Sequence, residues 1–164
     1  IVNLPASALL IVNEICRWGH PMALEITDVQ VWIFRRSEDK GEASRLGLKK
    51  LGLLGNRPTM TGDFIPGVLE RNYGIQTIIP EEHAVSQSHR FVSVELTRGK
   101  FTDTARRFYL EQIEQLRRRG ADGIILGCTE LPLLINAADV PVPTLATTDL
   151  HARMAVVFFM GTRS

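Results

Sequence analysis

The sequence predicts an α/β fold in which a parallel β-sheet carries helices on both of its faces. From residue 46 onward, short apolar runs alternate with segments whose apolar residues recur at helical spacing. Parallel strands that are buried on both faces are typically short and continuously apolar, and right-handed helical crossovers join them. The architecture expected from this alternation is a flavodoxin-like, doubly wound sheet.

Four apolar segments are predicted to be the strands of this sheet. The first ends in a polar turn, and the third ends in a glycine that polar residues follow at once. Short apolar runs bounded by turn residues are typical of buried strands. The predicted strands are LGLLGN (51–56), GIQTIIP (74–80), GIILG (123–127) and VPTL (142–145).

Helices are predicted between and after these strands. Thr59 or Thr61 is the expected cap of the first helix, and Pro66 within it indicates a kink or a late start. The strongest helical pattern begins after Thr102 and ends at Gly120. The residues that share one face of that helix are Ala105, Tyr109, Ile113 and Leu116. The predicted helices cover 59–72, 84–98, 103–119, 129–138 and 149–160.

The first 45 residues do not continue this regular pattern. Residues 5–18 are predicted to form a buried helix, and VQVWIF (29–34) has the β-branched and aromatic character of a strand. The charged stretch at 35–46 has no apolar stripe, so it is predicted to be a surface connection or a poorly packed helix. This stretch is the best candidate for a domain boundary.

The charge balance and the cysteine content argue against several classes of function. Lys and Arg total 19 and Asp and Glu total 18, so no basic excess favours nucleic-acid binding. Cys16 and Cys128 lie far apart and lack the ligand spacing of a zinc site, so no metal site is predicted. Glu14 and Arg17 end the apolar N-terminal stretch too soon for a membrane span. We therefore expect a reduced, cytoplasmic protein without nucleic-acid or membrane partners.

Polar side chains gather directly after two of the predicted strands. The first cluster is Asn56, Arg57, Pro58 and Thr59, and the second is Cys128, Thr129 and Glu130. The carboxyl ends of parallel strands share one edge of a sheet, and α/β proteins bind their ligands at that edge. Both clusters are therefore expected to lie in one candidate site.

Cys128 has the widest range of chemistry among these residues. Its thiolate could act as a nucleophile or a general base. The helix predicted to follow it would lower the pKa of the thiol, whereas Glu130 would raise that pKa. The alternative is that Cys128 is a small buried hydrophobic residue, with Thr129 as a helix cap and Glu130 as a favourable charge in the first turn.

Other residues of this edge could hold a substrate. Asn56, Thr59 and Thr129 carry groups that hydrogen-bond a carboxylate, and backbone N–H groups at a helix start could assist them. His151 follows the last strand, so it could line the same cleft or be structural. The sequence contains no GxGxxG and no Walker lysine motif, so nothing in it favours nucleotide binding.

The sequence around Cys128 resembles a motif of a known enzyme family. LGCTE (126–130), preceded by RGADGII and followed by LPLLI, is similar to the second cysteine motif of the aspartate/glutamate racemases. LKKLGLLGNRPTMTGDF resembles the strand and turn that open their second domain, and VPTLATTDLHARMAV resembles the segment that returns to the first domain. The resemblance covers roughly residues 46–160, and Glu130 favours the broad-specificity or aspartate-type branch.

The resemblance implies a cofactor-independent amino-acid racemase that acts on a small amino acid or dicarboxylate. In this family two cysteines face opposite sides of the substrate Cα, where one thiolate removes the α-proton and the other thiol delivers a proton. Matched by position, Cys128 is the second acid/base and Thr129 is a ligand of the substrate carboxylate. The residues that the resemblance assigns to the substrate site are Asn56, Thr59, Thr129, Glu130 and His151.

One part of the family pattern has no match. The first cysteine of these enzymes lies in a Cys-Asn-Thr-like motif, and Cys16, in NEICRWGH, has no Asn-Thr pair beside it. Residues 1–45 are therefore expected to be a partial or rearranged first-domain segment with a linker. Residues 46–160 are expected to be the racemase-like domain, whose last helix can return to the first domain.

Three functions remain open on this reading. The first is an amino-acid racemase whose other half is missing from this chain or is supplied by a partner subunit. The second is a non-catalytic racemase-like domain that binds small carboxylates or another protein. The third is a one-cysteine enzyme similar to arylmalonate decarboxylase or maleate isomerase, which Glu130 disfavours. A homodimer is one expected way to cover the apolar surface that a truncated first domain would leave.

Overall fold

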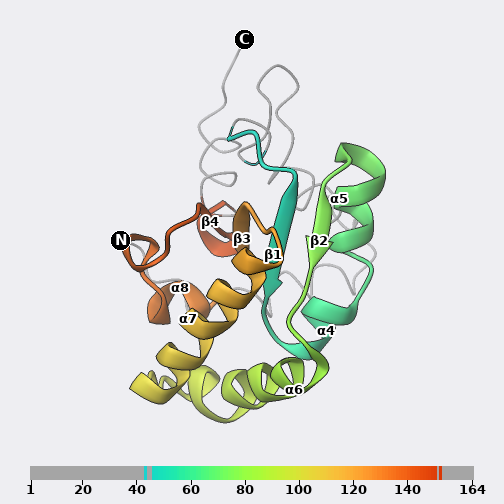
Figure 1. Ribbon diagram of the computed structural model, residues 1–164. Helices are drawn as coiled ribbons and strands as arrows, with labels where there is room; N and C mark the ends of the chain where they lie inside the picture. The colour runs from blue at the N-terminus through green and yellow to red at the C-terminus, as the bar shows by residue number, and fades with distance from the viewer. Residues whose placement is uncertain (1–42, 44–45, 151, 153–164) are drawn as a thin grey trace.

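The structure, a computed structural model, describes residue 43, residues 46–150 and residue 152 (Figure 1). The helix expected at 5–18, the strand expected at 29–34 and Cys16 lie outside the described residues. His151 and most of the helix expected at 149–160 lie outside them as well. The division into 1–45 and 46–160 stays a prediction.

Within the described part of the chain, four parallel strands form the predicted sheet, in the order β2-β1-β3-β4. All four predicted strands are confirmed, with bounds that differ by a few residues. Leu54 of β1 pairs with Leu126 of β3, and Leu126 pairs in turn with Ala146 of β4. The strands are β1 (Lys50–Leu54), β2 (Gln76–Ile78), β3 (Gly123–Leu126) and β4 (Thr144–Ala146).

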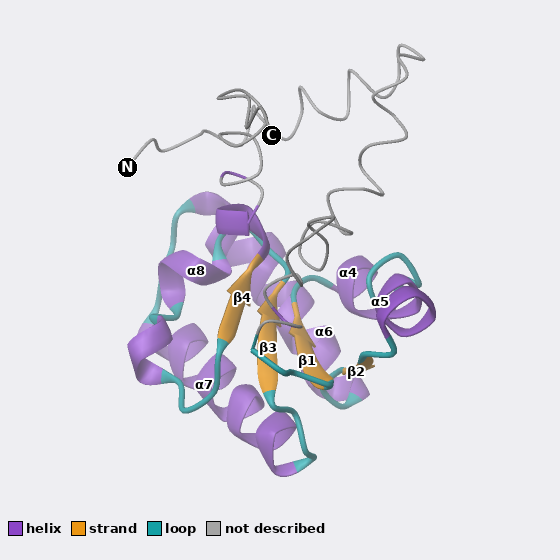
Figure 2. Cartoon of the chain, turned by 90° about the horizontal axis from the view of Figure 1, so that it is seen from above, coloured by secondary structure: helices purple, strands orange, loops and turns teal. Residues whose placement is uncertain are grey.

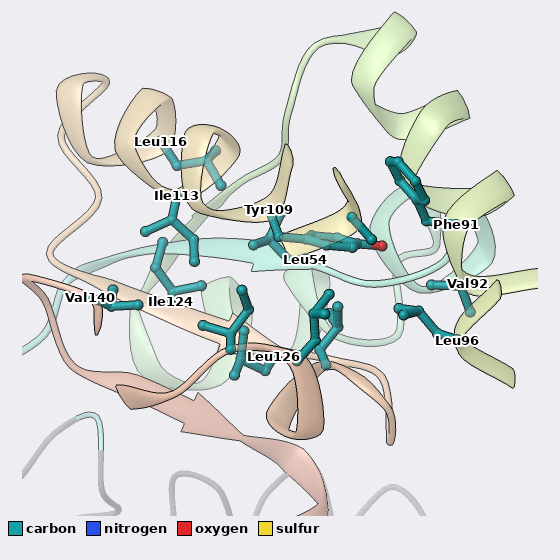
Figure 3. Packing of buried hydrophobic residues seen from close by; sticks show 14 of the residues in the cluster. Leu54, Phe91, Val92, Leu96, Tyr109, Ile113, Leu116, Ile124, Leu126 and Val140 are labelled. Atoms are coloured by element: carbon teal, nitrogen blue, oxygen red, sulfur yellow. The ribbon is translucent and has the colours of Figure 1, made fainter. Parts of the chain in front are cut away.

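Hydrophobic cores lie on both faces of the sheet, as the continuously apolar strands predicted. On one face, Leu54, Ile124 and Leu126 pack against the helix α7 (Asp103–Arg118) (Figure 3). The residues of α7 in this core are those expected to share one helical face, namely Ala105, Tyr109, Ile113 and Leu116. On the other face, the neighbouring side chains Leu53, Ile125 and Leu145 pack against α5 (Pro66–Tyr73) and Met60. The strands thus run between two layers of helix (Figure 2).

The helix α7 begins directly after Thr102, as predicted, and Thr102 caps it. Its Oγ1 accepts a hydrogen bond from the backbone N–H of Ala105 at 3.2 Å, and the same hydroxyl donates to Glu95 at 2.9 Å. The helix ends at Arg118, and Gly120 follows with a left-handed φ of 91° that glycine adopts without strain.

Replacing Thr102 by alanine should lower the free energy of unfolding by about 1 kcal/mol, because the cap of α7 is lost. For a chain of this size, that change shifts the melting temperature by about 3 °C. The comparison is Thr104→Ala, an exposed position in the first turn of the same helix. Equal melting temperatures for the two variants would contradict a capping role of Thr102.

The prediction of one continuous helix at 59–72 is wrong. The structure divides it into α4 (Arg57–Thr61) and α5, which begins at Pro66. The division follows from Pro66, which lacks the N–H that a continuing helix needs and is well suited to a first turn. Asn56 caps α4, so neither Thr59 nor Thr61 is the cap.

Two other helices differ from prediction in their internal geometry. The segment expected at 84–98 begins earlier, as α6 (Glu82–Arg90), and continues as a π-helical turn (Phe91–Glu95) and a 3₁₀ turn (Leu96–Arg98). The segment expected at 129–138 is only α8 (Leu131–Leu134) and a separate 3₁₀ turn (Ala137–Asp139). Ile135 between them is extended, and Asn136 caps the second turn. None of the described helices is both long enough and apolar enough to cross a membrane.

Candidate functional site

The order of the strands places the candidate site between β1 and β3. The chain runs from β1 outward to β2, and then crosses to β3 on the other side of β1 and continues to β4. Such a reversal leaves a crevice between the carboxyl ends of the two central strands, where doubly wound proteins bind ligands. The Asn56 turn (Gly55–Thr59) follows β1 and the Cys128 turn (Gly127–Glu130) follows β3, so both predicted clusters lie at this point.

The Asn56 turn is held by its own side chain. Asn56 is extended, with φ −75° and ψ 169°, and its Oδ1 accepts a hydrogen bond from the Thr59 N–H at 3.0 Å. This bond fixes the amide plane of Asn56 at the start of α4. Among the described residues, no hydrogen bond occupies the Nδ2 group of Asn56, which leaves two donors for a ligand.

The two turns contact each other directly. The N–H of Gly127 donates to the carbonyl of Leu54 at 2.8 Å. Thr59, the last residue of the Asn56 turn, lies against both Gly55 and Gly127, because a Cβ added at either glycine would lie 3.0 or 2.9 Å from its Cγ2 atom. Only glycine therefore fits at position 127 without displacing Thr59, and the close approach ties the backbone beside Cys128 to the Asn56 turn.

Cys128 and Glu130 form a hydrogen-bonded pair. The half-buried thiol donates to Oε2 of Glu130 at 2.8 Å. Burial and, next to it, this hydrogen bond raise the pKa of Cys128 to about 12, although the backbone N–H groups of Thr129 and Glu130 act in the opposite direction. At neutral pH the sulfur is thus a thiol, and its hydrogen bond goes to the carboxyl group of Glu130.

Replacing Glu130 by glutamine should lower the pKa of Cys128, because the negative charge that disfavours the thiolate is removed. Each unit of decrease raises the thiolate fraction tenfold, whereas the nucleophilicity of the thiolate falls by about threefold. The rate of Cys128 alkylation by iodoacetamide at pH 8 should therefore rise about threefold per unit.

The alkylation rate is followed by peptide mapping, so that Cys16 is counted separately. Glu111→Gln is the matched control, because it removes one carboxylate from the exposed side of α7. An unchanged or slower reaction of Cys128 in the Glu130 variant would contradict the pairing of these two residues.

The side chains of Arg57 and Thr129, which also belong to the two predicted clusters, do not take part in the Cys128–Glu130 pair or in the cap of α4. Thr129 is exposed and does not cap α8, whose N-cap position is Glu130 without a side-chain capping bond. The helix begins two residues later than expected, at Leu131. Arg57 turns toward α6, where its Nη2 group donates to Glu82 at 2.5 Å and to Ser86 at 2.7 Å. His151 lies outside the described residues.

Two buried hydroxyls next to the site were not singled out from the sequence as functional. The hydroxyl of Ser88 donates to the Gly55 carbonyl at 2.7 Å and lies 2.9 Å from the hydroxyl of Tyr109. Tyr109 was expected in the core, and its ring is there, but its polar end meets Ser88. No local pattern reveals this pairing, because the residues lie on different helices, α6 and α7.

A separate cavity of about 320 Å³ lies between α8 and the outer side of β4. Its lining includes Leu126, Pro132 and Arg106, and the guanidinium of Arg106 is already paired with Asp139 at 2.6 Å. Neither Cys128 nor Asn56 contributes to this cavity. The chemistry-bearing side chains thus place the candidate site at the turns after β1 and β3.

Comparison with known proteins agrees with the fold. The sequence profile of the Asp/Glu/hydantoin racemase family matches residues 38–155. A candidate Asp/Glu racemase from Yersinia pestis is 38% identical over 73% of this chain and 52% of its own, with a TM-score of 0.69. An aspartate racemase homologue from Pyrococcus horikoshii is 28% identical over 83% of this chain and 55% of its own, with a TM-score of 0.68.

The aspartate racemase of Picrophilus torridus is 24% identical over 80% of this chain and 51% of its own. Its TM-score of 0.58 shows a shared fold. The present chain thus spans about half the length of each of these proteins. The matched profile covers most of the chain, from before β1 to beyond β4. The chain belongs to the Asp/Glu/hydantoin racemase family.

Proposed function

We propose that this protein binds a small amino acid between the Asn56 turn and the Cys128 turn and exchanges its α-proton through Cys128. This is the reaction of a cofactor-independent amino-acid racemase, with aspartate or glutamate as the preferred substrate class. The observation that carries the proposal is the Cys128–Glu130 pair, with 2.8 Å between Sγ and Oε2, at the switch point of the sheet.

The pair can move a proton in both directions. In one direction the Cys128 thiol passes its proton to Glu130, and the thiolate then removes the α-proton while the C–H electron pair stays on the substrate. In the other direction the thiol delivers its proton to the carbanion, and the proton held by Glu130 returns to sulfur. Because the pKa of Cys128 is raised to about 12, the sulfur carries its proton in the resting state, and this state is suited to proton delivery.

The Asn56 turn supplies groups that can orient the substrate. The Nδ2 group of Asn56 carries two donors for a carboxylate, and Thr59 of the same turn lies against Gly127 of the Cys128 turn. Hydrogen bonds to the substrate carboxylate also stabilise the carbanion, because its negative charge spreads onto those oxygens. Orientation matters because the Cα–H bond must point at the sulfur of Cys128.

Inversion at Cα needs a second proton donor on the opposite face of the substrate. Cys16 is the other cysteine of the chain, and it lies outside the described residues. Cys128 alone can exchange the α-proton with retention of configuration. Exchange and inversion are therefore separate properties, and each is tested by its own readout.

The test is incubation of the protein with L- and D-aspartate and L- and D-glutamate in deuterated water. Loss of the α-proton signal in the NMR spectrum reports exchange, and chiral chromatography reports inversion. The proposal expects saturable exchange of at least one of these amino acids. Exchange without inversion would indicate that Cys128 acts as a one-base site.

Absence of exchange with all four amino acids would overturn the proposed reaction. Saturable binding without exchange would then favour the other candidate function, a racemase-like domain that binds small carboxylates. The observation that favours this second candidate is the raised pKa of Cys128. A thiol with a pKa of about 12 is scarcely ionised at neutral pH, so it cannot remove a proton without help from Glu130.

A further inference from the structure

The buried polar groups beneath the Asn56 turn form one connected chain. Ser88 and Tyr109 are both fully buried, in α6 and α7 respectively. A buried hydroxyl is costly unless it is hydrogen-bonded, and here both hydroxyls have partners. Ser88 Oγ lies 2.7 Å from the Gly55 carbonyl and 2.9 Å from the Tyr109 hydroxyl, which also lies 3.2 Å from the Ser88 carbonyl.

The donors and acceptors in this chain follow a fixed order. The Gly55 carbonyl can only accept, so Ser88 donates its hydroxyl proton there. The oxygen of Ser88 is then an acceptor, and the Tyr109 hydroxyl shares its single proton between this oxygen at 2.9 Å and the Ser88 carbonyl at 3.2 Å. The chain therefore runs from the Tyr109 hydroxyl to the Ser88 hydroxyl to the Gly55 carbonyl.

The last member of the chain belongs to the candidate site. Gly55 directly precedes Asn56, so the orientation of its carbonyl also sets the orientation of the peptide N–H of Asn56. A Cβ at Gly55 would lie 3.0 Å from Thr59 and 3.3 Å from the carbonyl of Gly127. A rotation of this peptide would thus disturb both the Asn56 turn and the backbone beside Cys128.

We propose that Tyr109 and Ser88 are positioning residues of the site: their hydroxyls hold the Gly55 carbonyl, and through it they hold Asn56 in the orientation that binds a substrate carboxylate. This inference rests on the proposed function for its substrate. A second contact supports it, because Cys128 packs against the same core cluster as the ring of Tyr109. The two hydroxyls act through Asn56 and do not touch the substrate.

Tyr109→Phe is the most selective variant for a test. It removes the hydroxyl and keeps a ring that can pack against Phe108 and Phe91, whose centroids lie 5.1 and 6.3 Å away. Ile113→Val is the matched control, since it loosens the same buried face of α7 one turn later without touching a hydrogen bond. Ser88→Ala is the stronger variant, because it removes the hydroxyl that bonds the Gly55 carbonyl, while the Tyr109 hydroxyl keeps only the Ser88 carbonyl as its acceptor.

The first measurement is amide hydrogen exchange of the Thr59 N–H in the full chain, followed by NMR. Tyr109→Phe should speed this exchange by roughly threefold to tenfold, the equivalent of one lost hydrogen bond, and Ser88→Ala should speed it further. Ile113→Val should leave the Thr59 rate at the wild-type value. An unchanged Thr59 rate in Tyr109→Phe, or an equal increase in Ile113→Val, would overturn the proposal.

The second measurement is the steady-state rate of α-proton exchange. Tyr109→Phe should raise KM by roughly threefold to tenfold and leave kcat within about twofold. The reason is that the weakened contact to the carboxylate is made equally in the bound substrate and in the transition state. The same substitution in an Asn56→Ala background should have no further effect on KM. A fall in kcat at constant KM, or fully additive effects, would contradict positioning through Asn56. If the wild type exchanges no amino acid, the proposed function fails, and the Thr59 amide still decides whether the hydroxyls hold the turn.

Discussion

Replacement of Cys128 by serine should lower the rate of α-proton exchange by about 10²- to 10⁴-fold, the usual contribution of a positioned acid or base. A serine hydroxyl cannot ionise near neutral pH, so it can neither accept the α-proton nor deliver one at a useful rate. The change is small in volume and sits at a half-buried position, so the fold should remain intact. The measurement is the loss of the α-proton signal of aspartate or glutamate in deuterated water.

Cys16→Ser is the control for this experiment, because it removes the other thiol of the chain. Comparable melting temperatures for the wild type and both variants would show that activity and not folding is compared. Exchange at a near wild-type rate in Cys128→Ser would remove Cys128 from the reaction. A loss of inversion with retained exchange in Cys16→Ser would identify Cys16 as the donor on the opposite face.

Gly127→Ala should disrupt the site from its backbone. The added Cβ would lie 2.9 Å from Cγ2 of Thr59 and 3.1 Å from the Leu54 carbonyl, so the two turns must move apart. Overpacking of this kind costs about 1–3 kcal/mol of stability. Because Cys128 is the next residue, its sulfur should shift relative to Asn56, and exchange should fall by about tenfold to a hundredfold.

Gly52→Ala separates the effect on the site from the effect on the core. A Cβ at Gly52 would meet Cδ1 of Ile124 at 2.7 Å and Leu116 at 3.0 Å, within the core and away from the turns. We expect Gly52→Ala to lower the free energy of unfolding, measured by urea denaturation, about as much as Gly127→Ala does. The rate of α-proton exchange should be unchanged at temperatures where the variant is folded. If both variants reduced exchange equally, the contact between the two turns would have no special role.

The order and type of the elements from residue 46 onward could be predicted because the two central strands, β1 and β3, are continuous apolar runs. Burial on both faces requires such runs, and the crossover rule makes the sheet parallel. The helix after Thr102 could be predicted for a similar reason, since its apolar residues have one period and its cap and terminator flank it. The strand order was not predicted from these runs, because strand pairing is a long-range property.

The errors lie where two local signals compete. At residues 57–73, the apolar spacing favoured one helix, but Pro66 begins a new one, and Asn56 caps the first by accepting from the Thr59 N–H. After Cys128, the spacing favoured a helix of ten residues, but Asn136 caps a separate turn and limits α8 to Leu131–Leu134. Pro66 decided the first case, and the side-chain hydrogen bond of Asn136 to the backbone decided the second.

The candidate site could be predicted in its position but not in its electrostatics. Strand ends bring Asn56 and Cys128 to one edge in any parallel sheet in which their strands are neighbours. The pKa of Cys128 could not be predicted, because the helix start and Glu130 act in opposite directions and burial exceeds both. The pairing of Ser88 with Tyr109 depends on how α6 meets α7, which no local pattern encodes.

The most direct test of the central claim is protection of Cys128 from alkylation by a bound amino acid. The claim is that the turns after β1 and β3 form one amino-acid site around this thiol. Iodoacetamide labelling of Cys128, quantified by peptide mapping, is measured with increasing aspartate or glutamate up to about 10 mM, above the usual range of KM values. We predict saturable protection that requires a higher concentration in Asn56→Ala. Labelling of Cys128 at the same rate with and without every one of these amino acids would contradict the claim.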